Sequence, residues 1–228
     1  PPVVPPVTMV FSTDFNIPTW TQGGGSDPQP TTDAIRHYGD WLRRDGQGDQ
    51  IIVDANRPGS AGNGFRHYRG PGQNDNGGGL KITLPKPLTE MWVRLWMRNG
   101  GGLAYSGGNP QYTKDMYWNV GGSNILIFGH QGGGWGLNSS GSVNIPSTKK
   151  FSDTNDGNFH CYEYHVRQSG GGLVEVWVDG VQVLSQVVAL GSVAWGEFAL
   201  GENQYNVTVP GYTDYDDLSI SSTGRIGC

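Results

Sequence analysis

Residues 90–98 (EMWVRLWMR) place two tryptophans and two arginines at alternate positions of one short segment. Successive residues of a β-strand point to opposite faces, so Trp92, Arg94, Trp96 and Arg98 share one face and aliphatic side chains fill the other. Flat indole rings stack on sugar rings, and guanidinium groups pair with carboxylates or sulfates. The pattern therefore predicts a strand whose outer face binds an acidic polysaccharide.

The same four residues also have a purely structural interpretation. The arginines can pair with acidic residues of neighbouring strands, and a loop or the N-terminal tail can cover the tryptophan rings. The two interpretations differ in one observable property, which is whether the face is open to a ligand.

The rest of the chain supplies the elements that must hold this strand. Segments of alternating polar and apolar residues, bounded by Gly, Asn, Pro and Asp, recur from residue 9 to residue 221. This pattern predicts an all-β fold, a two-sheet antiparallel β-sandwich of the jelly-roll type with long Gly-rich loops. Asp179-Gly180 lies between two such segments and predicts a hairpin with a type I′ turn. We expect residues 1–8 to form a Pro-rich tail or linker and residues 9–228 to form one domain.

Composition narrows the functional classes. The chain of 228 residues has a formal net charge of -5, which argues against nucleic-acid binding because that function favours a basic domain. No apolar run is long enough to predict a membrane span. Cys161 and Cys228 can form a disulfide in a secreted protein, or remain a buried and a terminal thiol. Asn138 and Asn206 begin N-glycosylation tripeptides. We therefore expect an extracellular or cell-surface protein.

The C-terminal half resembles the concanavalin A-like, laminin-G-like jelly rolls. Residues 160–183 (HCYEYHVRQSGGGLVEVWVDGVQV) are similar to a strand–hairpin–strand of that superfamily. Residues 214–221 (DYDDLSIS) resemble its closing strand and residues 9–15 (MVFSTDF) its opening strand. Residues 90–98 resemble the concave-sheet strand of secreted polysaccharide-lyase-like members. The superfold hosts lectins, hydrolases, lyases and adhesion modules, so the resemblance implies the fold and leaves the activity open.

The resemblance implies two candidate chemistries. Glucanases on this fold carry a Glu-x-Asp-x-x-Glu strand, because retaining hydrolysis requires two carboxylates about 5.5 Å apart. No glutamate of this chain has such an acidic partner, so a retaining glycosidase is not expected. A uronate lyase instead requires a group that neutralises the sugar carboxylate and a base that removes the C5 proton. The candidates for these roles are Arg94, Gln131, His130 and Tyr117, although the order His130-Gln131 departs from the Gln-x-His of alginate- and glucuronan-lyase-like enzymes.

The resemblance also implies a structural calcium ion, with Asp14 and Asp217 as ligands together with backbone carbonyls, and Asp216 as a substitute. The complete set expected to contact carbohydrate is Trp92, Arg94, Trp96, Arg98, Arg66, Tyr117 and Asn119.

Three functions remain open at this point. The leading interpretation is a secreted domain that recognises an acidic polysaccharide on a concave Trp/Arg face. The first alternative is a polysaccharide lyase that cleaves a uronic-acid polymer by β-elimination. The second alternative is an extracellular filament subunit that associates with other copies through residues 1–8, by adding a strand to an open sheet edge.

Overall fold

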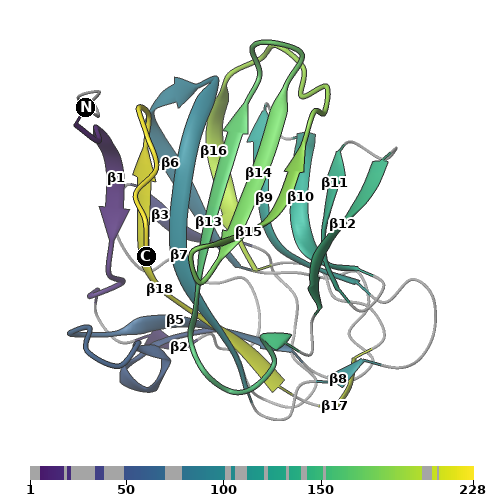
Figure 1. Ribbon diagram of the computed structural model, residues 1–228. Coiled ribbons are helices and arrows are strands. Elements are labelled where there is room, and N and C mark those ends of the chain that lie inside the picture. The colour runs from purple at the N-terminus through teal and green to yellow at the C-terminus, as the bar shows by residue number, and fades with distance from the viewer. Residues whose placement is uncertain are drawn as a thin grey trace.

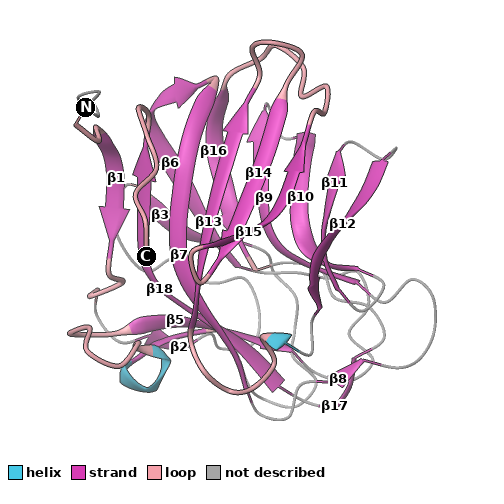
Figure 2. Ribbon diagram, in the orientation of Figure 1, coloured by secondary structure: helices cyan, strands magenta, loops and turns pink. Residues whose placement is uncertain are grey.

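The structure is a computed structural model of the chain (Figures 1 and 2). It describes residues 6–17, 20–21, 34–38, 49–69, 79–100, 104–105, 112–120, 123–131, 134–139, 143–150, 153–201, 207–209 and 211–228. Almost every regular element in this part of the chain is a strand (Figure 2). Two large antiparallel sheets confirm the predicted all-β sandwich.

The first sheet has nine strands in the order β15-β14-β13-β7-β18-β5-β4-β2, and β1 pairs with β18 beside that path. Along the chain these strands are β1 (Met9–Thr13), β2 (Trp20–Thr21), β4 (Gln50–Ile52), β5 (Gly64–Arg69), β7 (Glu90–Gly100), β13 (His160–Arg167), β14 (Leu173–Val178), β15 (Val181–Gln186) and β18 (Gly211–Ser221).

The second sheet has seven strands in the order β12-β11-β10-β9-β16-β6-β3. They are β3 (Ile35–Tyr38), β6 (Gly79–Leu88), β9 (Tyr112–Val120), β10 (Ser123–Gln131), β11 (Gly134–Ser139), β12 (Val143–Lys150) and β16 (Trp195–Leu200). The remaining elements are a small sheet of β8 (Ala104–Tyr105) and β17 (Val207–Val209), and the 3₁₀ helix η1 (Val53–Ala55).

The core lies between the two large sheets and follows the alternation of their strands. Met91, Val93, Leu95 and Met97 on β7 are all at most 2% exposed. The indole Nε1 of Trp118, on β9 of the opposite sheet, donates a hydrogen bond to the sulfur of Met91 at 3.2 Å. The aliphatic side of residues 90–98 is therefore packed against the other sheet, as the sequence pattern predicts.

The predicted hairpin at Asp179-Gly180 is confirmed. Strands β14 and β15 pair up to Val178 and Val181, which leaves these two residues as the turn. Both have positive φ angles, 50° for Asp179 and 80° for Gly180, as a type I′ turn requires.

The N-terminal segment before β1 lies partly outside the described residues. Within the described part, the backbone N–H of Thr8 donates to the hydroxyl of Thr223 at 2.7 Å, and the N–H of Ser222 donates to the carbonyl of Thr8 at 3.1 Å. Residues 6–8 therefore contact the C-terminal segment of their own chain. Self-association through residues 1–8 stays a prediction.

Candidate functional site

The alternating face of β7 is the starting point of the candidate site. Trp92, Arg94, Trp96 and Arg98 are all half-buried, whereas the residues between them are buried in the core. The face therefore points away from the core, but none of its four side chains is fully exposed.

Arg98 is held in place by a buried carboxylate. Asp214 lies opposite Arg98 on one side and opposite Arg66 on the other, because β18 runs between β7 and β5. The Arg98 guanidinium donates to Asp214 at 2.6 Å and Arg66 donates to the same carboxylate at 2.7 Å. Asp214 is 0% exposed. Burial raises the pKa of Asp214, and the hydrogen bonds and charges of the two arginines oppose that shift.

Three arginines of this region lie over aromatic rings. The guanidinium carbon is 4.6 Å from the ring centroid in the pair Arg57–Trp96, 4.6 Å in the pair Arg98–Phe159 and 3.6 Å in the pair Arg66–Tyr212. Arg66 and Arg98 also share the carbonyl oxygen of Asp54 as an acceptor. These six side chains are called the aromatic–arginine cluster: Arg57, Arg66, Trp96, Arg98, Phe159 and Tyr212.

The other end of the β7 face is occupied by groups of the chain itself. The rings of Trp92 and His165 stack with centroids 3.8 Å apart and planes 8° apart. Both ring nitrogens of His165 contact carboxylates, Glu90 at 2.9 Å and Glu175 at 2.8 Å. Trp92 therefore has one face of its ring covered by a neighbouring side chain.

Arg94 is the least satisfied of the four residues. Its Nη2 donates to the hydroxyl of Ser219 at 3.1 Å. Its Nε is buried and has no hydrogen-bond partner among the described residues. Across the strand pair β7–β13 its register partner is Glu163, whose carboxylate bonds elsewhere.

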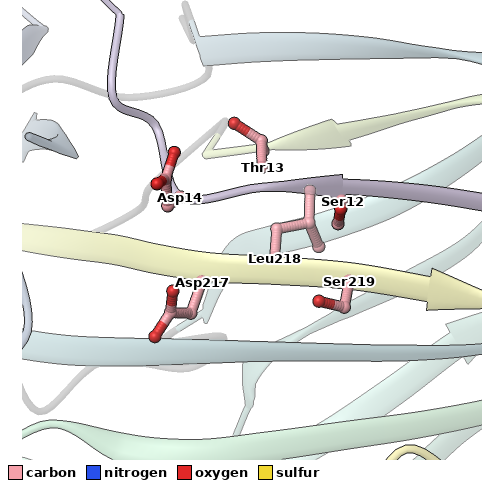
Figure 3. A pocket seen from close by; sticks show the side chains of 6 residues that line it. All are labelled: Ser12, Thr13, Asp14, Asp217, Leu218 and Ser219. Carbon is pink, nitrogen blue, oxygen red and sulfur yellow. The ribbon is translucent and has the colours of Figure 1, made fainter. Parts of the chain in front are cut away.

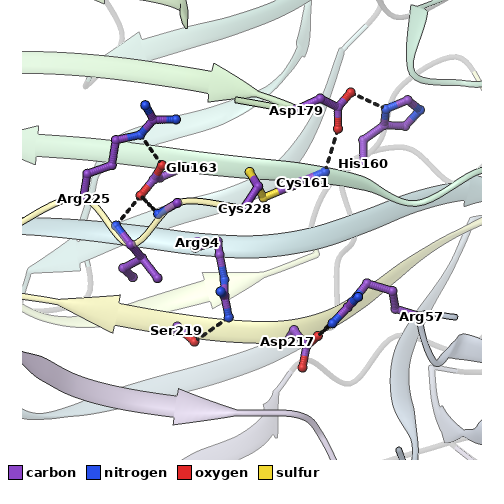
Figure 4. Close-up of a disulfide and its surroundings, with 12 residues drawn as sticks. Arg57, Arg94, His160, Cys161, Glu163, Asp179, Asp217, Ser219, Arg225 and Cys228 are labelled. Carbon is purple, nitrogen blue, oxygen red and sulfur yellow. Dashed lines mark hydrogen bonds and ion pairs between the residues drawn. A yellow bond between two sulfur atoms is a disulfide. The ribbon is translucent and has the colours of Figure 1, made fainter. Parts of the chain in front are cut away.

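A disulfide brings residues 222–228 onto this face. Cys161 and Cys228 are joined by an S–S bond of 2.13 Å (Figure 4). The segment 222–228 begins after Ser221 on β18 and ends at Cys161 on β13. Because β7 lies between β18 and β13, the segment must cross β7. Ser221 is in register with Trp92 and Cys161 with Trp96, so the crossing lies over the stretch that carries Arg94.

Groups of the chain itself therefore cover part of the Trp/Arg face, and carbohydrate contact at these four residues stays a prediction. For Arg98 the structural interpretation is correct, because this arginine pairs with Asp214 of the neighbouring strand β18. The cover over the middle of the strand comes from the C-terminal segment and not from the N-terminal tail. Only the end near Trp96 and Arg98 retains the arrangement of aromatic rings and guanidinium groups that the sequence suggested.

The remaining predicted site residues are on the other sheet. Tyr117 and Asn119 belong to β9, and His130 and Gln131 belong to the adjacent β10. Their side chains lie outside the described residues. The structure thus brings His130, Gln131 and Tyr117 onto neighbouring strands, but it places Arg94 on the opposite sheet, separated from them by the core.

Sequence reasoning missed three members of the cluster and Asp214, the carboxylate that anchors it. Asp214 was included in the resemblance to a closing strand, but its two arginine partners depend on the strand order. Arg57 lies outside the strands, and Phe159 is predicted to begin a strand that in the structure begins one residue later, at His160. Tyr212 is in register with Gly100, where a side chain would collide with its ring, a relation that only the strand pairing reveals.

The candidate calcium ligands line one pocket. Asp14 and Asp217 face a hollow of about 300 Å³ together with Ser12, Thr13, Leu218 and Ser219 (Figure 3). Asp217 is also in an ion pair with Arg57, whose Nε lies 2.8 Å from its carboxylate (Figure 4). In the described part of the chain no three His, Cys, Asp or Glu side chains gather in a metal-binding group. The two carboxylates suit a hard cation, but Arg57 must then leave Asp217, and calcium binding stays a prediction.

Comparisons with known proteins test the fold. No protein-family model and no curated protein matches the chain by sequence. Among solved structures, the cellulose-induced protein Cip1 superposes with a TM-score of 0.64 at 17% identity, over 96% of this chain and 99% of its own. An endo-β-1,4-glucuronan lyase from the fungus Trichoderma reesei gives 0.59 at 11% identity, over 90% and 95% of the two chains.

Alginate lyase Aly36B, solved with an alginate trisaccharide, gives 0.56 at 11% identity, over 95% of this chain and 99% of its own. The fold is that of the concanavalin A-like jelly rolls. Identities this low establish the fold alone, and the same architecture serves many functions.

Among the described residues, no helix has the length and apolar character needed to cross a membrane.

Proposed function

We propose that this protein recognises an acidic polysaccharide and that the aromatic–arginine cluster contacts it. The observation that carries the proposal is the stacking of three guanidinium groups on three aromatic rings at one end of the nine-stranded sheet. A sugar ring can stack on such a surface while its carboxylate pairs with the guanidinium edges.

The cluster is fixed before a ligand arrives. Arg66 and Arg98 are anchored on the buried Asp214, and Arg57 is anchored on Asp217. The three arginine side chains nevertheless remain 16%, 21% and 28% exposed, so a ligand can reach them. Side chains that are already ordered lose less conformational entropy on binding, which favours affinity.

The structural neighbours support a carbohydrate role without identifying the ligand. Two of them are named for action on glucuronan and alginate, which are polymers of uronic acids. The disulfide between Cys161 and Cys228 supports an extracellular location, because such bonds persist in oxidising compartments.

Binding to alginate and glucuronan, measured by isothermal titration calorimetry or affinity electrophoresis, tests the proposal. We expect Arg57→Gln to weaken binding by about tenfold, as the loss of one charge-assisted contact implies. Lys81→Gln is the matched control: Lys81 is a half-exposed cation on β6 of the other sheet, paired with Glu197 at 3.0 Å. If the Lys81 variant lost affinity and the Arg57 variant kept the affinity of the wild type, the assignment of the surface would be contradicted.

A lyase activity is the second candidate. It is favoured by the placement of His130, Gln131 and Tyr117 on the paired strands β9 and β10, where Tyr117 is in register with Ile127. In this candidate Gln131 neutralises the sugar carboxylate, since Arg94 is on the other sheet, and Tyr117 or His130 removes the C5 proton. β-Elimination creates a double bond, so ultraviolet absorbance should rise during incubation with the polymer and stay flat for Tyr117→Phe. An unchanged spectrum with alginate, glucuronan and heparin argues against this candidate.

A further inference from the structure

Beyond the disulfide, the segment 222–228 is attached to β13 through the carboxylate of Glu163. Glu163 on β13 accepts hydrogen bonds from the backbone N–H groups of Ile226 at 2.6 Å and Gly227 at 2.9 Å. The Arg225 Nε donates to the same carboxylate at 2.5 Å (Figure 4). Glu163 is 0% exposed, so the segment seals this carboxylate from solvent. Without the disulfide, residues 224–228 depend chiefly on Glu163 and on the contact of Arg225 with Trp177.

The segment also covers an aromatic ring. The guanidinium carbon of Arg225 lies 4.5 Å from the ring centroid of Trp177, on β14. Trp177 is in register with Glu163, so both residues lie on the same outer face of the sheet. The segment therefore occupies a strip that runs from β7 to β14.

The strip beneath the segment continues the proposed binding surface. Trp96 belongs to the aromatic–arginine cluster, and Arg94 and Trp92 follow it at every second position of β7. The buried Nε of Arg94 has no partner among the described residues, and its register neighbour Glu163 binds the segment. The Nε edge of a guanidinium between two half-buried tryptophans is thus present but buried while the segment is in place.

We propose that residues 222–228 form a strap that a thiol reductant releases, and that its release extends the polysaccharide surface along β7 to Trp92. The inference rests on the proposed function. The strap covers this strip and excludes a ligand from it sterically, while Arg225 and two backbone N–H groups of the strap bind the carboxylate of Glu163.

The chemistry of release is a two-electron thiol–disulfide exchange with a dithiol. A thiolate of the dithiol attacks the sulfur of Cys228, which is the exposed residue of the pair, and forms a mixed disulfide. Cys161 leaves as a thiolate and takes up a proton. The second thiol of the reductant then displaces Cys228, which also becomes a thiol, and the reductant is oxidised to its own disulfide.

Part of the strap is expected to stay attached after reduction. Thr223 accepts a hydrogen bond from the N–H of Thr8, and Ser222 donates to Thr8, so the start of the segment is tied to the N-terminal strand. Residues 224–228 therefore move away from the sheet after reduction, and the fold of the two sheets is unchanged.

Amide hydrogen exchange and polysaccharide binding together test the strap. In the oxidised protein the N–H groups of Ile226 and Gly227 are protected by Glu163. Dithiothreitol, or the variant Cys228→Ser without it, should speed their exchange by about tenfold or more and leave the core amide of Val93 protected. The same two treatments should raise the affinity for alginate or glucuronan by about tenfold, and dithiothreitol should have no further effect on Cys228→Ser.

Three results would overturn the inference. The amides of the strap could stay protected from exchange after reduction, or they could exchange faster without a gain in affinity for the polymer. The core amide of Val93 could also lose its protection, which would indicate unfolding. A different result separates the inference from the proposed function. If the oxidised protein binds the polymer through Arg57 but reduction adds nothing, the proposed function survives and the strap is only a structural clamp. If neither redox form binds, the proposed function fails, and the covering role of the strap fails with it.

Discussion

Asp216 is a buried carboxyl group of the nine-stranded sheet, and its protonation should make the stability of the protein depend on pH. This residue is 0% exposed and lies on β18 at the irregularity between residues 216 and 219. Burial raises the pKa of its carboxyl from 3.8 to about 6, and the charge of Asp217 adds to the shift. Hydrogen bonds from the backbone N–H groups of Arg57 and Asp217, each 2.8 Å long, act in the opposite direction.

The sign of the pH dependence follows from the raised pKa. Between about pH 4 and pH 6 the folded protein holds a proton on Asp216 that the unfolded chain has lost. Its contribution to stability is complete below about pH 4 and is lost as the pH rises through 6. A shift of about two units corresponds to about 3 kcal/mol of unfolding free energy, at 1.36 kcal/mol per unit.

Urea unfolding of the wild type and of Asp216→Asn, at several values between about pH 3 and pH 7, measures this contribution. The variant carries no titrating group, so its stability relative to wild type should rise by about 3 kcal/mol across this range. Asp156→Asn is the control with the opposite sign. Hydrogen bonds from Asn158 lower the pKa of Asp156 from 3.8 to about 2. The unfolding free energy of Asp156→Asn relative to wild type should therefore fall as the pH rises from about 2 to about 4 and stay constant above that range. A difference between Asp216→Asn and wild type that does not change from pH 4 to pH 7 would refute the reasoning.

Three further predictions concern packing and metal binding. Asp214→Asn leaves two partly buried arginines without their shared carboxylate and should lower the unfolding free energy by about 3–5 kcal/mol in urea. Gly172→Ala should cost about 2 kcal/mol or more, because the glycine has φ +85° and a Cβ there would lie 1.8 Å from a backbone oxygen. Gly170→Ala, at φ +67° with its nearest neighbour 4.0 Å away, should cost about 1 kcal/mol in the same assay. If calcium binds as predicted, calcium should raise the thermal midpoint, Asp14→Asn should remove that effect, and Arg57→Gln should strengthen it; a midpoint that calcium does not move would contradict the site.

The fold and one half of the candidate site were accessible from the sequence because they depend on local periodicity. Alternation at every second residue identified the buried and outer faces of β7, and the glycine after Asp179 identified a hairpin that requires positive φ angles. Such patterns depend only on the geometry of a single strand or turn. They do not depend on which other strands lie beside it.

The partners of each outer residue depend on the strand order, which periodicity does not encode. Strand β18 inserts between β7 and β5, although more than a hundred residues separate it from either. That placement turns Asp214 into the shared acceptor of Arg66 and Arg98. The same order puts β9 in the opposite sheet, so Tyr117 is separated from Arg94, although both belong to strands with an aromatic-rich alternation. A site predicted from residues of two strands is therefore wrong when the two strands belong to different sheets of the sandwich.

The C-terminal segment shows how these two kinds of information combine. Residues 222–228 have no strand periodicity, so their course cannot be predicted from their own sequence. Two facts determine the course: the bond of Cys228 to Cys161, and the position of β7 between β13 and β18. Once both are known, the segment must pass over Arg94, and the half-buried state of a strand face rich in tryptophan and arginine has a physical cause. The exposure of such a face is therefore set by what crosses it as much as by its own residues, and release of the segment is the direct test of that exposure.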